Sequence, residues 1–236
     1  MTFTQRWAAA GALLALSGAA QAALIDRGGG MIYDTTRNLT WLADMNHAET
    51  SGYAAAHAGG TGPYEIRANG QMGWNAAVAW ADGLVYGGFS DWRLPTVNMA
   101  DTTCLGGIGS GVNCSGGELS GLMIADLGYN TDGGALLTAD DTAQQVANQA
   151  LFRNQPLGGS FWTNTAHPTL PDWAAVFDAF FMGEPGIQGW REKELAHYAM
   201  AVRTGDVAAA VPEPQTLALA LLALGATALA RRQRPA

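Results

Sequence analysis

Residues 88–96 have the sequence Gly-Phe-Ser-Asp-Trp-Arg-Leu-Pro-Thr, which decides how the middle of the chain is divided. Apolar side chains recur with helical spacing just before this stretch, and a pair of glycines ends the pattern, so we expect a helix over residues 73–85. Within the stretch we expect Trp92 to be buried and Arg93 to pair with a carboxylate. Thr96 is a candidate N-cap for a short helix that would follow it.

Short strands are expected on both sides of this stretch. Residues 31–33 and 39–41 are β-type runs separated by a polar turn, which predicts a hairpin. Residues 48–70 are rich in Gly, Ala and Ser and are expected to form a loop, whereas residues 118–127 predict a second short helix. Further strands are expected at 161–163, 173–177 and 197–203. The order β-β-α-loop-α-β-β-β predicts an α+β domain with short strands, two or more short helices and long loops.

The charge balance excludes one class of partner. Charged residues make up only 14% of the chain, against about 25% in an average globular protein. Residues 23–210 contain eight Lys and Arg against nineteen Asp and Glu, a formal charge of −11, and Lys193 is the only lysine. Because affinity for phosphate backbones comes from Lys and Arg that displace counterions, we exclude nucleic acid as a partner.

The N-terminal residues have the three parts of a secretory signal peptide. Arg6 supplies the positive charge, residues 7–19 are almost wholly apolar, and residues 20–22 have the small-x-small pattern that signal peptidase recognises. We therefore expect signal peptidase to cleave between Ala22 and Ala23. The alternative, a buried N-terminal helix, does not account for the order of these three parts.

The C-terminal residues combine a short motif, an apolar run and a basic end. The motif consists of Val211, Pro212, Glu213 and Pro214. The apolar run at 216–230 has 15 residues and is shorter than the roughly 20 that cross a bilayer comfortably. The arginines within 231–234 are expected to stay on the cytoplasmic side.

This layout resembles the PEP-CTERM sorting signal of Gram-negative bacteria. The resemblance implies recognition by an exosortase, a membrane cysteine protease-transpeptidase that cleaves at the motif. We therefore expect residues 214–230 to hold the chain in the inner membrane only transiently. The protein is then exported, anchored in the cell envelope and finally placed at the cell surface or outside the cell.

Besides the helix with Trp74 and Ala77, five segments of the exported part resemble one known family, in order along the chain. They are residues 26–34, 38–41, 88–96, 161–165 and 198–203. These segments resemble the Lcl C-terminal domain, a family named for a collagen-like bacterial adhesin. The resemblance covers most of residues 24–206. It implies the C-type-lectin-like architecture that is also seen in formylglycine-generating enzymes, and it offers no catalytic residues to carry over.

The chain is thus expected to have three parts. A signal peptide, with its helix, occupies residues 1–22, the Lcl C-terminal-like domain occupies 23–206, and a linker with the sorting segment and its hydrophobic helix occupies 207–236. Residues 97–115 depart from the commonest family pattern because they insert a loop bounded by two cysteines.

Cys104 and Cys114 are the only cysteines, and in an exported protein such a pair predicts a disulfide. Closing so short a loop contributes roughly 2–3 kcal/mol. A zinc site is the alternative, but it needs further cysteines or histidines nearby in the sequence. The glycines within 106–111 lack the lysine of a phosphate-binding Walker loop, so we interpret them as a flexible loop.

The other sequence signals for a metal site or a catalytic site are weak. Glu194 and His197 have the Glu-x-x-His spacing of a helical metal site, but such sites need a second copy or ligands from facing helices. His47, His57 and His167 are scattered through loop-like stretches. The sequence contains neither a Gly-x-Ser-x-Gly motif nor a His-Glu-x-x-His motif. We therefore predict no metal centre and no enzyme.

Calcium is an alternative ligand for one acidic segment. Its candidate oxygen donors are Asp126, Asn130, Asp132, Asp140 and Asp141. The spacing is not that of an EF-hand, and Asp and Asn are also common turn residues, so the turn interpretation is favoured.

Two tryptophans are the candidate binding residues. Trp92 and Trp162 are favoured as core residues, and the functional alternative places them on a sugar-stacking surface. We expect an exported protein of the envelope or extracellular matrix with a non-catalytic, lectin-like or adhesion domain that binds extracellular polysaccharide. One alternative is a structural component of an exopolysaccharide or biofilm matrix without a discrete ligand. The other is a secreted hydrolase that uses paired carboxylates.

Overall fold

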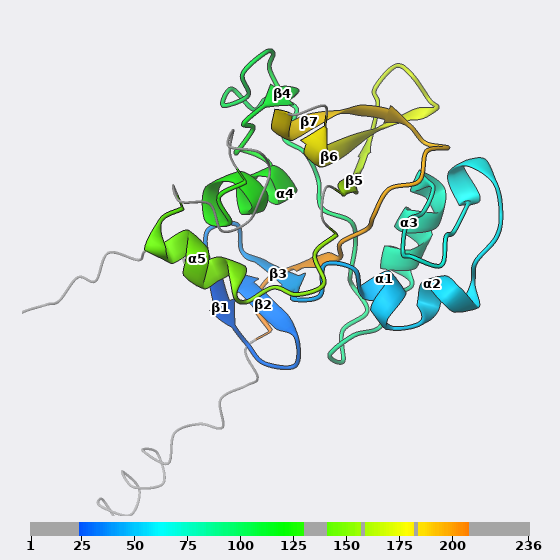
Figure 1. Cartoon of the computed structure of the whole chain (residues 1–236), viewed down its shortest axis with the longest axis horizontal. Coiled ribbons are helices and arrows are strands. Elements are labelled where there is room, and N and C mark those ends of the chain that lie inside the picture. The colour runs from blue at the N-terminus through cyan, green and yellow to red at the C-terminus, as the bar shows by residue number, and fades with distance from the viewer. Residues whose placement is uncertain (1–23, 130–140, 157–158, 182–183, 208–236) are drawn as a thin grey trace, which may run out of the picture.

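A computed structural model of the chain describes residues 24–129, 141–156, 159–181 and 184–207. These residues form two antiparallel four-stranded sheets with short helices around them (Figure 1). The α+β class predicted from the sequence is confirmed, whereas the C-type-lectin-like architecture stays a prediction. No helix within these ranges has the length and hydropathy needed to cross a membrane. The signal peptide, the sorting motif and the apolar run lie outside the described residues.

The first sheet contains the predicted hairpin. Its strands, in sheet order, are β1 (Leu24–Asp26), β2 (Met31–Asp34), β3 (Leu39–Leu42) and β8 (Val202–Thr204). The turn between β2 and β3 is held by the Asp34 carboxylate, which accepts hydrogen bonds from the backbone N–H groups of Thr36 and Arg37. Asn38 has a φ of 53°, a left-handed conformation that Asn tolerates better than most residues. Of the strand predicted at 197–203, only the last part belongs to a sheet strand.

The second sheet is longer than the sequence predicts. Its strands, in sheet order, are β4 (Gly111–Val112), β7 (Glu184–Glu192), β6 (Trp173–Phe181) and β5 (Ser160–Ala166). The predicted strands at 161–163 and 173–177 are confirmed within β5 and β6. Strand β7 was not predicted, because its Pro and two Gly residues lower its β-propensity.

Most helices are short. They are α1 (His47–Thr50), α2 (Tyr53–Ala56), the 3₁₀ helix η1 (Gly62–Tyr64), α3 (Trp74–Asp82), α4 (Glu118–Ser120), the π-helix η2 (Gly121–Asp126) and α5 (Ala143–Gln149). Helix α3 confirms the predicted helix at 73–85, and α4 with η2 confirms the one at 118–127. The loop expected at 48–70 is wrong in part, because α1 ends within it and it contains α2 and η1. No helix follows Thr96, whose backbone N–H donates to the Glu118 carboxylate.

Two hydrophobic clusters fill the interior. One lies between the first sheet, η2 and the side of β5 and β6 that presents Phe161 and Phe177. The other lies between α3 and the opposite face of the second sheet, where Trp162 and Val176 point. Because neighbours on a strand alternate faces, Phe161 and Trp162 enter different clusters. Figure 1 shows α4 and α5 on one side of the sheets and α1, α2 and α3 on the other.

Candidate functional site

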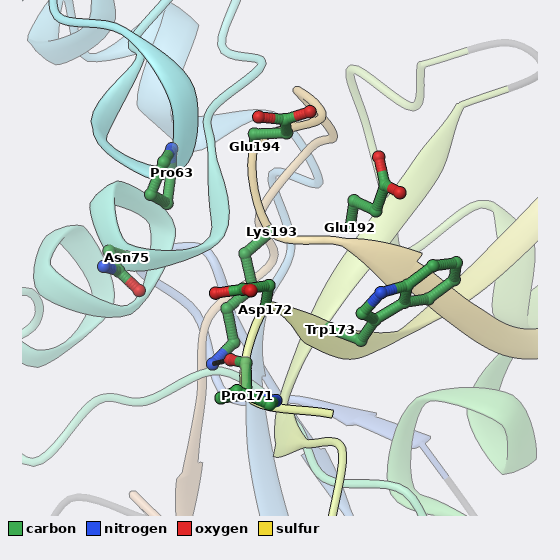
Figure 2. Close-up of a pocket in the computed structure, with 8 residues that line it drawn as sticks. All are labelled: Pro63, Asn75, Pro171, Asp172, Trp173, Glu192, Lys193 and Glu194. Atoms are coloured by element: carbon green, nitrogen blue, oxygen red, sulfur yellow. Dashed lines mark hydrogen bonds between the residues drawn. The ribbon is translucent and has the colours of Figure 1, made fainter. Parts of the chain in front are cut away.

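A hollow of about 420 Å³ opens between the η1–α3 segment and the adjoining ends of β6 and β7. Its lining residues are Pro63, Asn75, Pro171, Asp172, Trp173, Glu192, Lys193 and Glu194. Figure 2 shows Pro63 and Asn75 on one side, Trp173 and Glu192 on the other, and Asp172 and Lys193 between them. We call this cavity the acidic hollow, because three of its side chains are carboxylates.

Backbone hydrogen bonds fix the walls of the acidic hollow. The Lys193 N–H donates to the Asp172 carbonyl at 2.8 Å, and the Trp74 N–H donates to the Lys193 carbonyl at 2.9 Å. Gly73 allows the start of α3 to pack against η1, since a Cβ at this position would lie 2.7 Å from the Cα of Pro63. The hollow is therefore a built feature of the fold and joins three separate segments of the sequence.

The only ammonium in the acidic hollow is already engaged. Lys193 Nζ donates to the Pro171 carbonyl at 2.6 Å and lies 4.3 Å from the centre of the Trp74 ring. A cation over an indole face is attracted by the ring quadrupole. Trp74 is held in turn by its indole N–H, which donates to the Thr163 carbonyl at 2.8 Å. Lys193 thus ties the loop before β6 to α3.

The three carboxylates of the acidic hollow are not engaged in this way. Asp172, Glu192 and Glu194 are exposed, and their side chains form no ion pair with any residue in the described ranges. By contrast, every arginine between residues 24 and 207 lies within 4.0 Å of a carboxylate. The hollow is therefore the place where unpaired negative charge gathers beside a cavity.

An aromatic strip lies at the edge of the acidic hollow, on the face of β6 and β7 that points away from α3. Trp173 lies directly opposite Glu192 in the β6–β7 register, and Trp190 lies opposite Ala175 two residues further along. Side chains at these positions share one face of the sheet, so the two indoles are neighbours on it. Both tryptophans are half-buried, and the His167 ring packs edge-on against Trp190 with 4.5 Å between ring centres.

Comparison with protein families identifies the chain. The sequence model of the Lcl C-terminal domain matches residues 30–203. The chain belongs to the Lcl C-terminal domain family. A second model, of the PEP-CTERM protein-sorting motif, matches residues 210–234, so the protein is an exported, exosortase-sorted protein of the cell envelope. Comparisons with curated proteins and with solved structures found no similar protein.

The two tryptophans predicted as sugar-stacking residues lie in the core of the Lcl C-terminal domain. Trp92 is 2% exposed and Trp162 is fully buried. Their indole N–H groups donate to backbone carbonyls, of Tyr86 at 3.2 Å and of Met72 at 2.7 Å. The sugar-stacking prediction for Trp92 and Trp162 is therefore wrong, because neither ring offers a free face to a ligand. The favoured interpretation, that they are core residues, is confirmed.

The disulfide prediction is confirmed: Cys104 and Cys114 are bonded to each other. Asp101 lies beside the two cysteines. Within the described ranges, these are the only three His, Cys, Asp or Glu side chains whose potential metal-ligating atoms all lie within 4.8 Å of one another. Sulfurs in a disulfide are not thiolate ligands, and the Asp101 carboxylate is used by the backbone N–H groups of Thr103 and Gly116. Burial raises the pKa of Asp101, but these hydrogen bonds outweigh it, and the net pKa is lowered. The group holds the Cys-bounded loop in place.

The proposed calcium segment is only partly described. Asp126 forms an ion pair with Arg37, which also pairs with Asp34. Asp141 accepts a hydrogen bond from the Gln149 amide at 3.0 Å. Asn130, Asp132 and Asp140 lie outside the described residues, so calcium binding there stays a prediction.

The four histidines of the Lcl C-terminal domain lie apart, each against a different aromatic ring. His47 packs on Tyr86, His57 on Tyr53, His167 on Trp190 and His197 on Trp162. Glu194 lies in a turn and His197 forms an isolated β-bridge with Met72, so their spacing does not place them on one helical face. Burial, helped by the positive charges of Arg191 and Arg67, lowers the pKa of His197 to about 4.

A second hollow, of about 310 Å³, lies on the other side of α3. Its lining residues are His47, Ser51, Tyr53, Ala79, Trp80, Gly83, Leu84 and Val85. None of these residues carries a carboxylate, so the two hollows differ in chemistry.

Sequence reasoning missed Trp173, Trp190 and the three carboxylates. The signal that was available is a pair of tryptophans, Trp173 and Trp190, with acidic residues just outside them at 172, 192 and 194. Without the unpredicted strand β7, nothing in the sequence placed Glu192 opposite Trp173.

Proposed function

We propose that the Lcl C-terminal domain of this exported envelope protein is a non-catalytic binding module, and that the acidic hollow is where it binds extracellular polysaccharide. The observation that supports this most is the set of three unpaired carboxylates around a cavity beside half-buried tryptophans. Ligand sites are usually concave, with apolar and aromatic walls and a few polar groups that fix orientation.

The chemistry of the lining suits a sugar. Carboxylates accept strong, charge-assisted hydrogen bonds from ligand hydroxyls. Trp173 supplies an apolar body with large contact area. The fixed Lys193 leaves the cavity negative, so the hollow favours uncharged or cationic ligands over anionic ones.

The position of the hollow suits an anchored binding module. The last described residues lie beside β1, where Asp206 pairs with Arg27. In Figure 1 this end of the chain is well separated from the ends of β6 and β7. The sorting segment continues from residue 207, so an envelope-anchored domain would hold the acidic hollow away from its attachment.

The residues that line the acidic hollow favour binding over turnover. They include no histidine, serine or cysteine, and their only lysine is engaged by Pro171 and Trp74. Paired carboxylates hydrolyse glycosides in other proteins, so hydrolysis of the polysaccharide has to be measured as well as binding.

A glycan array probed with the full chain in mild detergent tests the proposal. We expect the unmodified chain to bind polysaccharide fragments on the array. The Asp172→Asn and Trp173→Ala variants should lose this binding. Asp82→Asn is the matched control, since Asp82 is an exposed carboxylate of α3 outside the hollow. New reducing ends after incubation would show a hydrolase instead. No retention by the array, together with a matrix defect on deletion, would favour the structural matrix component.

The expected removal of the signal peptide and of the sorting tail is tested by the mass of the mature protein. We expect it to begin at Ala23 and to end within residues 212–214. A mature chain that still contains residues 231–234 would show that the tail is retained as an anchor, although export would stand.

A further inference from the structure

One end of the Lcl C-terminal domain carries an exposed apolar turn, residues 84–89. Val85 is 72% exposed, the largest fraction among the exposed large apolar side chains of the described ranges. It precedes a tight turn in which the backbone N–H groups of Tyr86 and Phe89 each donate to the other's carbonyl at 3.0 Å. Gly87 and Gly88 lie between them with φ of 61° and 85°, the left-handed conformations that such a two-residue turn requires. We call residues 84–89 the apolar turn.

Contacts with the connection between β1 and β2 hold the apolar turn in place. The Tyr86 hydroxyl donates to the Gly29 carbonyl at 2.8 Å. Gly87 packs closely against Met31, since a Cβ at Gly87 would lie 2.7 Å from the Met31 sulfur. Val85 is therefore held at the surface by a turn that has defined contacts with the first sheet.

The apolar turn lies at the end of the domain from which the sorting segment continues. Arg27 lies in the β1–β2 connection, and its guanidinium pairs with Asp206. The connection thus contacts the apolar turn through Gly29 and the last described residues through Arg27. In Figure 1 this connection lies at the lower edge of the domain, whereas β4 and the Cys-bounded loop lie at the upper edge.

The length of the remaining chain keeps this end of the domain near the membrane. Residues 208–213 separate the last described residue from the segment at 214–230. Because a chain extends by at most about 3.3–3.6 Å per residue, this linker spans no more than about 25 Å. While residues 214–230 are held in the membrane, the apolar turn therefore stays close to the lipid surface.

The surroundings of Val85 suit lipid. Val85 adjoins the second hollow, whose walls include Leu84, Tyr53 and Ala79 and no carboxylate. Exposed apolar surface of this kind marks a contact with a protein or a membrane, and the short linker favours the membrane. The nearby carboxylate of Asp82 is exposed and gains nothing from an anionic surface, so the contact depends on the apolar side chains.

We propose that the anchored domain rests on the lipid bilayer through the apolar turn, with Val85 inserted at the boundary between headgroups and acyl chains. This contact fixes the orientation of the domain, so that the Cys-bounded loop points away from the membrane. It goes beyond the proposed polysaccharide site and does not depend on it.

The experiment uses the full chain, reconstituted through its apolar run into phosphatidylcholine vesicles whose acyl chains carry a nitroxide quencher. Val85→Cys provides the only free thiol, since Cys104 and Cys114 are bonded to each other, and it is labelled with an environment-sensitive dye. Ile108→Cys is the matched control, because Ile108 is 71% exposed and lies in the Cys-bounded loop. We expect the label at 85 to be quenched and its emission to move to shorter wavelength, and the label at 108 to stay unquenched.

Vesicle flotation shows that the chain is anchored, and the melting temperature of each variant shows that it folds. No quenching at position 85 in the anchored chain would overturn the proposal. Equal quenching at positions 85 and 108 would also overturn it, because the domain would then have no fixed orientation on the bilayer. An emission shift at position 85 that appears only after an exosortase is added would assign the apolar turn to that enzyme instead. Binding on the glycan array is independent of all these outcomes.

Discussion

Arg93 and Glu118 form a two-pronged ion pair, with guanidinium nitrogens 2.7 and 2.8 Å from the two carboxylate oxygens. The Thr96 N–H donates to the same carboxylate at 2.7 Å. The pair joins the stretch at 88–96 to the start of α4, and the Arg93 backbone pairs with Val202 of β8 in the first sheet. A family motif is thus tied to two elements that are remote in sequence.

Glu118→Gln should lower the free energy of unfolding by about 1–3 kcal/mol, because Arg93 loses its charged partner in a half-buried site. Urea denaturation measures this change. Glu65→Gln, which breaks the more exposed pair with Arg67, is the control and should cost much less stability than Glu118→Gln. Equal losses in the two variants would contradict the structural role of the Arg93–Glu118 pair.

The same pair predicts a pH dependence. Burial raises the pKa of Glu118, but hydrogen bonds from Arg93 and Thr96 outweigh it and hold the pKa below its usual range. A lowered folded-state pKa stabilises the fold above the unfolded value, about 4.3, and this stabilisation is lost as pH falls through the folded value. Thermal melts below about pH 4.3 should therefore show a smaller further loss for Glu118→Gln than for the unmodified chain.

The lowered pKa of His197 predicts a second pH dependence of stability, over a different pH range. Its folded-state pKa is about 4, lowered chiefly by burial. Between about pH 6.5 and 4 the unfolded chain binds a proton that the folded chain does not, so stability falls as pH falls through this range. Melting temperatures of His197→Gln should depend less on pH there. His57→Gln, at an exposed ring, is the matched control, and an unchanged slope for His197→Gln would contradict a buried neutral imidazole.

The disulfide should stabilise the domain by about 2–3 kcal/mol, since it closes a short loop in the unfolded chain. The double variant Cys104→Ser, Cys114→Ser should melt about 4–12 °C lower. Reductant should lower the melting temperature of the unmodified chain to that of the variant and leave the variant unchanged. Melting temperatures that reductant does not affect in the unmodified chain would contradict a stabilising cross-link.

Substitutions of Trp162 and Trp173 should have opposite effects: the first should lower stability, and the second should lower glycan affinity. Trp162→Phe removes one of the two hydrogen bonds that the Met72 carbonyl accepts, the other coming from the His197 N–H, and should cost about 0.5–1.5 kcal/mol of stability without affecting glycan affinity. Trp173→Ala should affect affinity far more than stability, because Trp173 is half-buried at the start of β6. A Trp162 variant that folds normally and loses glycan affinity would contradict this division.

Local signals account for what the sequence predicted correctly. The β2–β3 hairpin, α3 and the Cys104–Cys114 bond each depend on residues that are near one another in the chain, so periodicity and spacing found them. Strand β7 has a weak β-propensity, and the helices within 48–70 are too short to be stable on their own, so both depend on tertiary packing.

The candidate site was missed for the same reason. It joins η1, α3 and the ends of β6 and β7, and its key pair, Trp173 opposite Glu192, exists only through the sheet register. Composition pointed to tryptophan as the candidate residue type for a sugar site. It could not tell the buried Trp92 and Trp162 from the half-buried Trp173, because exposure depends on long-range packing.

Binding in the acidic hollow is tested most directly by an NMR titration of the tryptophan indole N–H signals, assigned by Trp→Phe variants. On addition of a polysaccharide fragment that binds on the glycan array, the signal of Trp173 should move most, followed by that of Trp190. The signals of the buried Trp41, Trp92 and Trp162 should not move. Trp80, which lines the second hollow, is an internal control and should also stay in place. Shifts confined to Trp80, or no shift of Trp173 at a saturating concentration of the fragment, would contradict ligand binding at the acidic hollow.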